Sequence, residues 1–322
     1  MTFLLSRLPR AAFTIFIILV LNFFLFRLLP GANSDRILVS NPKFSQQTRL
    51  ALRHEFGLDR PLGMQFLTYL ANTARGRLGL SFAQKRPVAE VIRERVGPTW
   101  LLVGSAEGLA ILLGTVLGTL AAWRRGTWLD WSTVGFSLVM YAVPTFWLGI
   151  LLVSGLCVGL RAFPTFGMLV PGEDHATWWL LAADLLHHLF LPVLTLTLVL
   201  LGGYLLIMKE SLGGVLAEDY ITTARAKGLT ERAILSHHAL PNALLPMVTL
   251  IALNLGFLMG GAIEVETVFS WPGLGRLMFE ALQARDFPVL QGLFLIITVM
   301  VVLANLLADW LYLFLDPRVK AT

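Results

Sequence analysis

The stretch TTARAKGLTERAILSHHALP, residues 222–241, is a short charged segment in a chain whose other long segments are apolar. Glu218 and Asp219 come just before it, and acidic residues are favoured at the positive N-terminal end of a helix. Gly228 tolerates the left-handed conformation that ends many helices, and Thr230 has the side chain of a helix N-cap. The pattern therefore predicts an elbow of two short helices, over residues 220–227 and 231–239.

The amino-acid composition indicates whether the rest of the chain lies in water or in a membrane. Of 322 residues, 56% are hydrophobic and only 14% are charged, and the mean hydropathy is +0.73. Soluble domains are about one quarter charged, so this chain lacks the polar surface of a water-soluble globule. The net charge of +5 lies between apolar runs and forms no basic face, which argues against nucleic acid as a partner. The single cysteine, Cys157, excludes an internal disulfide and a multi-cysteine metal site.

Six apolar segments are long enough to cross a bilayer core of about 30 Å, which takes about 17–25 helical residues. Lipid offers no hydrogen-bond partners to the backbone, so each segment is expected to be a helix. The first run is too long for the core of a signal peptide and is interpreted as a retained span. Pro144 is expected to kink the third. The predicted fold is an all-α membrane protein with six spans at 11–29, 98–123, 131–160, 189–208, 242–263 and 289–315.

Lysine and arginine in short loops predict the orientation, because they are enriched on the cytoplasmic side. With the N-terminus inside, three arginines fall in short outer loops and ten basic residues fall inside: Arg7, Arg10, Arg124, Arg125, Lys209, Arg225, Lys227, Arg232, Arg318 and Lys320. Both termini and the elbow are therefore expected in the cytoplasm, the lipid bilayer being the surroundings of the spans. The predicted organisation is a tail with the first span (1–29), an extracytoplasmic region (30–97), a five-helix core (98–315) that includes a cytoplasmic loop (209–241), and a cytoplasmic tail (316–322).

The extracytoplasmic region is expected to contain two helices, at 45–56 and 61–70, each with apolar residues at helical spacing. They are expected either to lie on the membrane surface or to pack over the mouth of a channel. In the loop 161–188, Trp178 and Trp179 are interpreted as interfacial anchors. Adjacent His187 and His188 point to different helix faces, so no metal site is predicted there.

Motifs for catalysis are missing from the sequence. It contains no phosphate-binding G-x-x-x-x-G-K-[ST] loop, no G-x-S-x-G nucleophile turn and no H-E-x-x-H zinc helix. No catalytic residues and no cofactor are predicted in this chain. The residues instead favour a passive pathway that is driven from outside the chain.

Glu107 is the clearest candidate for a pathway residue, since ionisable groups inside a membrane are costly. It is expected either to line a polar cavity and contact a cationic part of the substrate, or to be satisfied by a partner on a neighbouring helix. Ser105, Tyr204 and Asn254 are further candidates for the pathway, although small polar residues also commonly join helices.

The elbow also has two interpretations. Its small residues and mixed charges suit close contact with another protein, with Ala217, Tyr220, Ala224 and Lys227 expected on one face. Alternatively, it is a solvated connection between two spans.

A resemblance favours the first interpretation. The elbow resembles the cytoplasmic coupling motif of bacterial ABC importer permeases, which reads E-A-A, three residues, G, nine residues, I-x-L-P. Thr222-Thr223-Ala224 occupy the first three places, Gly228 the glycine, and Leu240-Pro241 the end. Thr222, Thr223 and His238, which holds the isoleucine place, depart from the pattern.

Other motifs are similar to the dipeptide, oligopeptide and nickel subfamily, in its first permease type. They include RLLPG (27–31), GLDRP (57–61), PTFW (144–147), ETVFSWPGLG (266–275) and RDFPV (285–289). Two departures are Ala32-Asn33 in place of Asp-Pro, and Pro241 in place of Arg before Asn242.

The resemblance implies a type I ABC importer-like permease fold with cytoplasmic coupling helices, in a bacterial inner membrane. It implies three kinds of partner protein: a second homologous permease, two ABC ATPase subunits that bind ATP and Mg, and an extracytoplasmic substrate-binding protein. The residues implied in coupling to the ATPases are Glu218, Asp219, Tyr220, Thr223, Ala224, Arg225, Ala226, Lys227, Gly228 and Leu229.

Peptides are the substrate that the resemblance favours, with nickel, metal chelates, glutathione-like compounds and opines as alternatives. From the residues alone, a self-sufficient carrier driven by an ion gradient is the rival interpretation. A membrane-embedded enzyme is a third.

Overall fold

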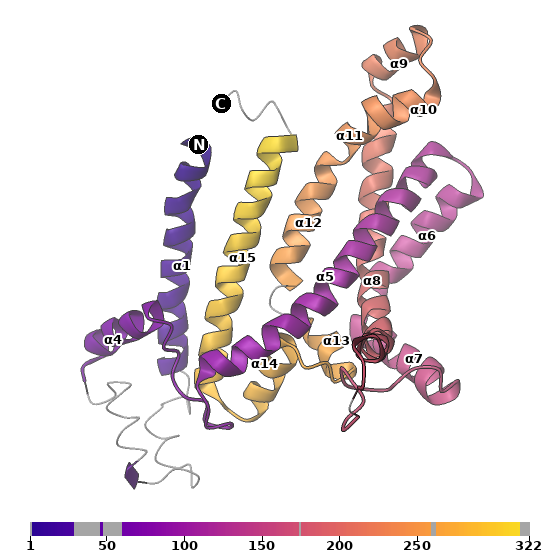
Figure 1. The fold of residues 1–322 in the computed structure, drawn as a ribbon. Helices are drawn as coiled ribbons and strands as arrows, with labels where there is room; N and C mark the ends of the chain where they lie inside the picture. Colours follow the sequence, from indigo (N-terminus) through magenta and orange to yellow (C-terminus); the bar gives the residue numbers. More distant parts are fainter. Residues whose placement is uncertain (1, 29–45, 48–59, 174, 259–261, 316–322) are drawn as a thin grey trace.

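The computed structural model describes residues 2–28, 46–47, 60–173, 175–258 and 262–315, and side chains are described for 7–26, 46–47, 60–173, 175–256 and 262–307. Long helices run side by side through most of the molecule, and Figure 1 shows that the start of α1, the end of α15 and the α9–α10 elbow lie at one end. We call this the α9 end and the opposite one the α14 end. The described part of the chain is helical apart from its connections and one isolated bridge between Leu80 and Pro87.

The helices follow the apolar runs but extend beyond several of them. The long ones are α1 (Thr2–Leu28), α5 (Val88–Trp123), α8 (Trp178–Leu216), α12 (Leu245–Leu258) and α15 (Phe287–Leu315). α5 begins ten residues before Pro98, and α8 begins at the Trp178–Trp179 pair, so part of the expected loop 161–188 is helical. An apolar run predicts the part of a helix that lies in lipid, but it does not predict helical turns that continue beyond the run.

Pro144 divides the third predicted span into two elements. α6 (Trp128–Ala142) stops before it, and α7 (Thr145–Leu152), which continues as the π-helix η1 (Val153–Gly159), starts after it at an angle of 100°. Proline disfavours a helical conformation in the preceding residue, and Val143 is accordingly extended. The expected kink is therefore a full break.

The fifth predicted span is also preceded by a bend. The segment 231–243, made of α10 (Glu231–Ala233), η2 (Ile234–Ala239) and α11 (Leu240–Ala243), meets α12 at 43°. Four continuous helices are long and apolar enough to cross a membrane, and the number is six when each bent pair counts as one span. The six-span prediction is confirmed in this form.

The short helices lie at the two ends of the bundle. α9 (Asp219–Ala226) forms the elbow with α10, while α13 (Ile263–Val268) and α14 (Leu274–Gln283) cover the opposite end. α4 (Leu62–Ala74) lies across α1, which bears out the helix expected at 61–70. The helix expected at 45–56 lies outside the described residues except for residues 46–47, which are helical.

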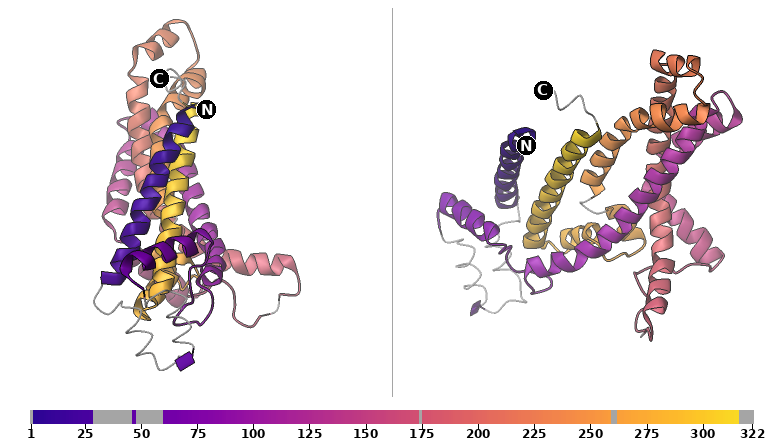
Figure 2. Two further views of the ribbon diagram at one scale, coloured as in Figure 1. Left: turned by 90° about the vertical axis from the view of Figure 1, so that its left-hand side faces the viewer. Right: turned by 45° about the horizontal axis from the view of Figure 1, so that its top comes forward.

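Two helices provide the centre of the packing. α5 and α8 touch more extensively than any other pair of described elements, and they cross at glycines. A Cβ on Gly118 would lie 2.8 Å from Met208 Cβ, and one on Gly114 would collide with Tyr204. The views in Figure 2 show that this pair belongs to a flat arrangement, because the long helices lie one behind another when seen from the α1 side.

Candidate functional site

The elbow has the two helices that its sequence predicts. α9 ends at Ala226 and is followed by Gly228, whose φ of +79° is the left-handed conformation that glycine adopts without strain. Its N–H donates to Arg225 O at 3.0 Å, and the next N–H, of Leu229, donates to Ala224 O at 3.3 Å. Thr230 caps the second helix by accepting a hydrogen bond from Ala233 N at 3.3 Å. Backbone hydrogen bonds and the conformation of Gly228 therefore fix the shape of the turn.

An ion pair joins the two arms of the elbow. Arg225 Nε lies 2.8 Å from Glu231 Oε1, and this carboxylate holds the pKa of the guanidinium above its ordinary value. Both side chains are exposed, so the pair adds little stability. It orients two charges at the tip of the molecule.

The elbow is anchored by apolar contacts on one side. Ile221 and Ala224 of α9 are buried in a cluster with Leu212 of α8 and with Ile234 and Ala239 of η2. The sequence-based prediction placed Ala217, Tyr220, Ala224 and Lys227 on one face, and it was wrong in part. Ala217, Tyr220 and Lys227 are exposed and only Ala224 faces the cluster, because Ile221 takes the inward position.

The remaining predicted coupling residues form the outer surface of the elbow. Two of them are large apolar side chains at an exposed tip, Tyr220 at 42% and Leu229 at 41% exposure. Tyr220 OH accepts a hydrogen bond from Asn242 Nδ2 at 3.3 Å. The other exposed members of the predicted set are Glu218, Asp219, Thr223, Arg225, Ala226, Lys227 and Gly228.

A buried polar cluster lies deeper in the bundle, where three predicted pathway residues meet. Tyr204 OH of α8 donates a short hydrogen bond to Glu107 Oε1 of α5, and Asn254 Nδ2 of α12 donates to Tyr204 OH at 3.0 Å. Glu107 is 2% exposed, and its Oε2 has no hydrogen-bond partner among the described residues. Three helices are thus joined at one point by side chains that are far apart in the sequence.

Ser105 does not belong to this cluster. It is half-buried on α5 and lies two residues from Glu107, which puts the two side chains on different faces of the helix. The structure therefore brings together three of the four predicted pathway residues.

An apolar stripe connects the polar cluster with the elbow. Tyr204, Met208 and Leu212 follow at four-residue intervals along one face of α8, over about 12 Å of helix. All three are buried in the cluster that also holds Ile221 and Ala224. The buried side chains of α9 therefore pack against this stripe on α8.

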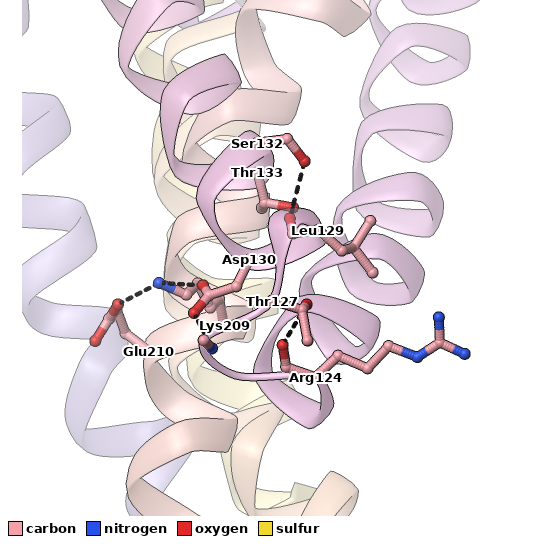
Figure 3. A network of polar contacts seen from close by, with 9 residues as sticks. Arg124, Thr127, Leu129, Asp130, Ser132, Thr133, Lys209 and Glu210 are labelled. Atoms are coloured by element: carbon pink, nitrogen blue, oxygen red, sulfur yellow. Dashed lines mark hydrogen bonds and ion pairs between the residues drawn. The ribbon is translucent and has the colours of Figure 1, made fainter.

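A second polar site at the α9 end was missed by the sequence analysis. Lys209 of α8 makes an ion pair with Asp130, in the first turn of α6, with Nζ and Oδ1 2.8 Å apart (Figure 3). Asp130 Oδ2 also accepts a hydrogen bond from Gly126 N at 2.9 Å, which fixes the turn between α5 and α6. Both residues fall outside or at the edge of the apolar runs, so neither counted as an intramembrane charge.

At the α14 end, a buried carboxylate organises the start of α14. Glu266 Oε1 accepts a hydrogen bond from Thr99 Oγ1 at 2.8 Å, and Oε2 accepts one from Arg276 N at 2.9 Å. Thr99 Oγ1 in turn accepts from Leu274 N at 2.7 Å. Burial raises the pKa of Glu266. The motif at 266–275 thus forms a fixed junction between α13, α14 and α5.

Histidines at this end contact a carboxylate that the sequence analysis did not consider. His188 Nδ1 lies 2.9 Å from Asp184 Oδ1 and His175 Nε2 lies 3.0 Å from Oδ2 of the same residue. His187 points elsewhere, to Ala162 O. Within the described ranges, no group of three histidine, cysteine, aspartate or glutamate side chains is arranged to hold a metal ion.

Comparison with known proteins relates this geometry to a family. Residues 114–321 match the family model "Binding-protein-dependent transport system inner membrane component", and residues 1–103 match the model for the N-terminal part of such components. In the solved structure of the MetNI methionine ABC transporter, one chain is similar in fold, with a TM-score of 0.54 and 16% identity over 70% of this chain and 96% of that one.

Relatives in sequence extend over nearly the whole chain. A putative peptide permease protein of Brucella suis biovar 1 (strain 1330) is 38% identical over 94% of each chain. The glutathione transport system permease protein GsiC of Escherichia coli (strain K12) is 36% identical over 99% of each, and the probable peptide ABC transporter permease protein y4tP of Sinorhizobium fredii is 35% identical over 97% and 98%. The chain belongs to the family of binding-protein-dependent transport system inner membrane components.

Proposed function

We propose that the chain forms one half of the translocation pathway of an ABC importer for peptides, including short ones of the size of glutathione. The observation that carries this substrate class is the similarity, over at least 94% of the chain, to permeases named for peptides or for glutathione. Nickel and metal chelates remain the alternative within the same family. ATP and Mg would be bound by two separate ATPase subunits.

The elbow is proposed as the surface that receives the ATPase. Its outer face carries exposed Tyr220 and Leu229 at the tip, while Ile221 and Ala224 fasten it to α8. Movement of the ATPases on binding nucleotide would push the elbow, and the packed stripe on α8 would pass this movement to the Glu107 cluster. The elbow would then be an element with two positions, and nucleotide binding would shift the equilibrium between them.

A second, homologous permease is proposed as the partner that completes the pathway. Glu107, Tyr204 and Asn254 would then lie beside the pathway, as would Ser105 on its own face of α5. In the single chain Glu107 is shielded and its Tyr204 partner satisfies one oxygen, which supports a role in holding helices together more than direct contact with substrate.

The proposed orientation puts the α9 end and both termini in the cytoplasm. Residues 30–97 and the α14 end would then face a substrate-binding protein outside, with 98–315 as the core and 316–322 as a cytoplasmic tail. The grouping of the α1 start, the α15 end and the elbow at one end of the bundle supports this arrangement.

Two experiments test the proposal. In the first, the transporter is purified through a tag on this chain, and the ATPase subunits and a second permease are expected to copurify. Transport by this chain alone in liposomes, driven by an ion gradient, would contradict the ABC mechanism and favour a self-sufficient carrier.

The second experiment identifies the substrate. The binding protein that stimulates the ATPase of the purified complex is isolated, and its bound ligands are determined by mass spectrometry. Peptides are expected, whereas a bound nickel ion or metal chelate with no peptide would overturn the substrate class and leave the importer mechanism intact.

A further inference from the structure

α4 lies across α1 (Figures 1 and 2). The Phe23 ring of α1 contacts Phe66 and Tyr69 of α4, with ring centroids 5.2 and 5.6 Å apart. Phe23 comes five residues before Leu28, where α1 ends, which corresponds to about 7.5 Å along the helix. Since the first predicted span ends at residue 29, α4 contacts α1 near one end of a span, and amphipathic helices commonly lie between headgroups and acyl chains at that level.

The face of α4 that points away from the protein is apolar. Met64 and Leu67 are 50% and 60% exposed, and Ala71 and Ala74 continue the same stripe at spacings of three and four residues. An exposed apolar stripe on a helix near the end of a membrane span matches acyl chains.

The C-terminal end of α4 is cationic. Arg75 and Arg77 are exposed just beyond the helix, and neither has a carboxylate partner within the described part of the chain. Long basic side chains at the level of the headgroups are attracted to phosphate.

Arg77 also lines a pocket between α4, α1 and α15. The pocket is open on one side and has an accessible volume of about 70 Å³. Its walls combine polar side chains near Arg77, among them Asn72 and Thr73, with the rings of Phe23, Phe26 and Phe287. A ligand that fits has an anionic end and an apolar body.

We propose that this pocket binds an anionic glycerophospholipid of the outer leaflet, with its phosphate at Arg77 and an acyl chain along the phenylalanines. Among the described residues that line the pocket, Arg77 is the one cation and matches one phosphate, and the apolar wall matches an alkyl chain. The stripe on α4 then rests on neighbouring lipids, so that α4 and the lipid together close the side of the bundle between α1 and α15. The contacts of α4 with α1 and the lining of the pocket carry this inference, which is independent of what is transported.

The first test identifies what contacts the apolar stripe on α4. The photoreactive amino acid benzoylphenylalanine is introduced in place of Leu67 in the full transporter, which is reconstituted in bilayers of phosphatidylethanolamine and phosphatidylglycerol and irradiated. Phospholipid adducts on the peptide that contains residue 67 are expected. Cross-links to residues 29–59 of this chain or to another subunit, or a lack of lipid adducts, would overturn the proposal.

The second test concerns the phosphate. Arg77→Gln is compared with Arg75→Gln, a neighbouring arginine that does not line the pocket. The phosphatidylglycerol that remains with each purified complex is measured by mass spectrometry. We expect about a fivefold weaker retention for Arg77→Gln and little change for Arg75→Gln, since one cation near a membrane surface contributes on this scale. Equal retention in the two variants would rule out Arg77 as the phosphate ligand.

Discussion

Lys209 Nζ lies 2.8 Å from Asp130 Oδ1, and this ion pair ties α8 to the start of α6 at the end of the bundle that carries the elbow. Both side chains are largely shielded, at 16% and 12% exposure. Asp130→Ala would leave the ammonium with only Glu210, 3.5 Å away and mostly exposed. We expect a loss of about 1–3 kcal/mol of stability, because a charged group loses its buried partner.

Thermal unfolding of the purified complex measures this loss. Glu210→Ala is the matched control, since it removes the exposed partner of the same lysine, and it is expected to change little. The exchange of the two charges, Asp130→Lys with Lys209→Asp, should recover part of the stability. An equal effect of Asp130→Ala and Glu210→Ala would contradict the importance of the buried pair.

Gly114 allows α5 to approach α8. A Cβ there would collide with Tyr204, so Gly114→Ala is expected to separate the helices and cost about 1–3 kcal/mol. Gly108 is on the same helix with no atom within 4 Å of an added Cβ, and Gly108→Ala serves as the control. Thermal stability and the yield of assembled complex are the measurements, and similar values for the two variants would show that the crossing is not tightly packed.

Tyr204 is expected to stabilise the bundle through Glu107. Tyr204→Phe removes the donor to Glu107 Oε1 and leaves a buried carboxyl without its partner, at a cost of about 1–3 kcal/mol. In a double-mutant cycle with Glu107→Gln, unfolding of the complex should show a non-additive interaction between the two sites. Additive losses would mean that the hydrogen bond contributes nothing of its own.

The fold was largely predictable because its strongest signals are local. Apolar runs predict helices in lipid. Gly228 and Thr230 predict the elbow, because a helix-ending glycine and a helix N-cap each determine the backbone only in their immediate neighbourhood. Pro144 predicted a bend, but its size of 100° depends on what α7 packs against. The packing partners of α7 cannot be read from the residues next to Pro144 in the sequence.

The candidate site was predictable only as a set of residues. Glu107 stood out as a charge in an apolar run, yet its pairing with Tyr204 and Asn254 depends on how three helices pack. Asp130 and Lys209 gave no sign of pairing, because each lies just outside a predicted span and only their proximity in the folded chain makes them notable. Ile221 was overlooked since the helical face was assigned without knowledge of the direction of α8.

Glu266 should make stability depend on pH. Burial raises its pKa in the folded state, so its favourable contribution is present below the ordinary glutamate pKa of about 4.3 and is lost as the pH rises through the raised value. The melting temperature of wild type minus that of Glu266→Gln should therefore decrease between acidic and neutral pH. A difference that grows with pH would mean that the donors Thr99 and Arg276 N stabilise the ionised form by more than burial opposes it.

Gly228 tests the coupling role of the elbow separately from its packing. Its φ of +79° cannot be adopted by proline, and proline also removes the N–H that donates to Arg225 O, so Gly228→Pro should deform the elbow. Asparagine enters the left-handed region at low cost, and Gly228→Asn is the matched control. No side chain lies within 4 Å of an added Cβ, so neither change creates a clash within this chain. We expect Gly228→Pro to abolish transport and the stimulation of ATPase activity by the binding protein, while Gly228→Asn keeps both and each variant still inserts in the membrane. Coupling in Gly228→Pro equal to wild type would remove the elbow from the path by which the ATPases drive the permease.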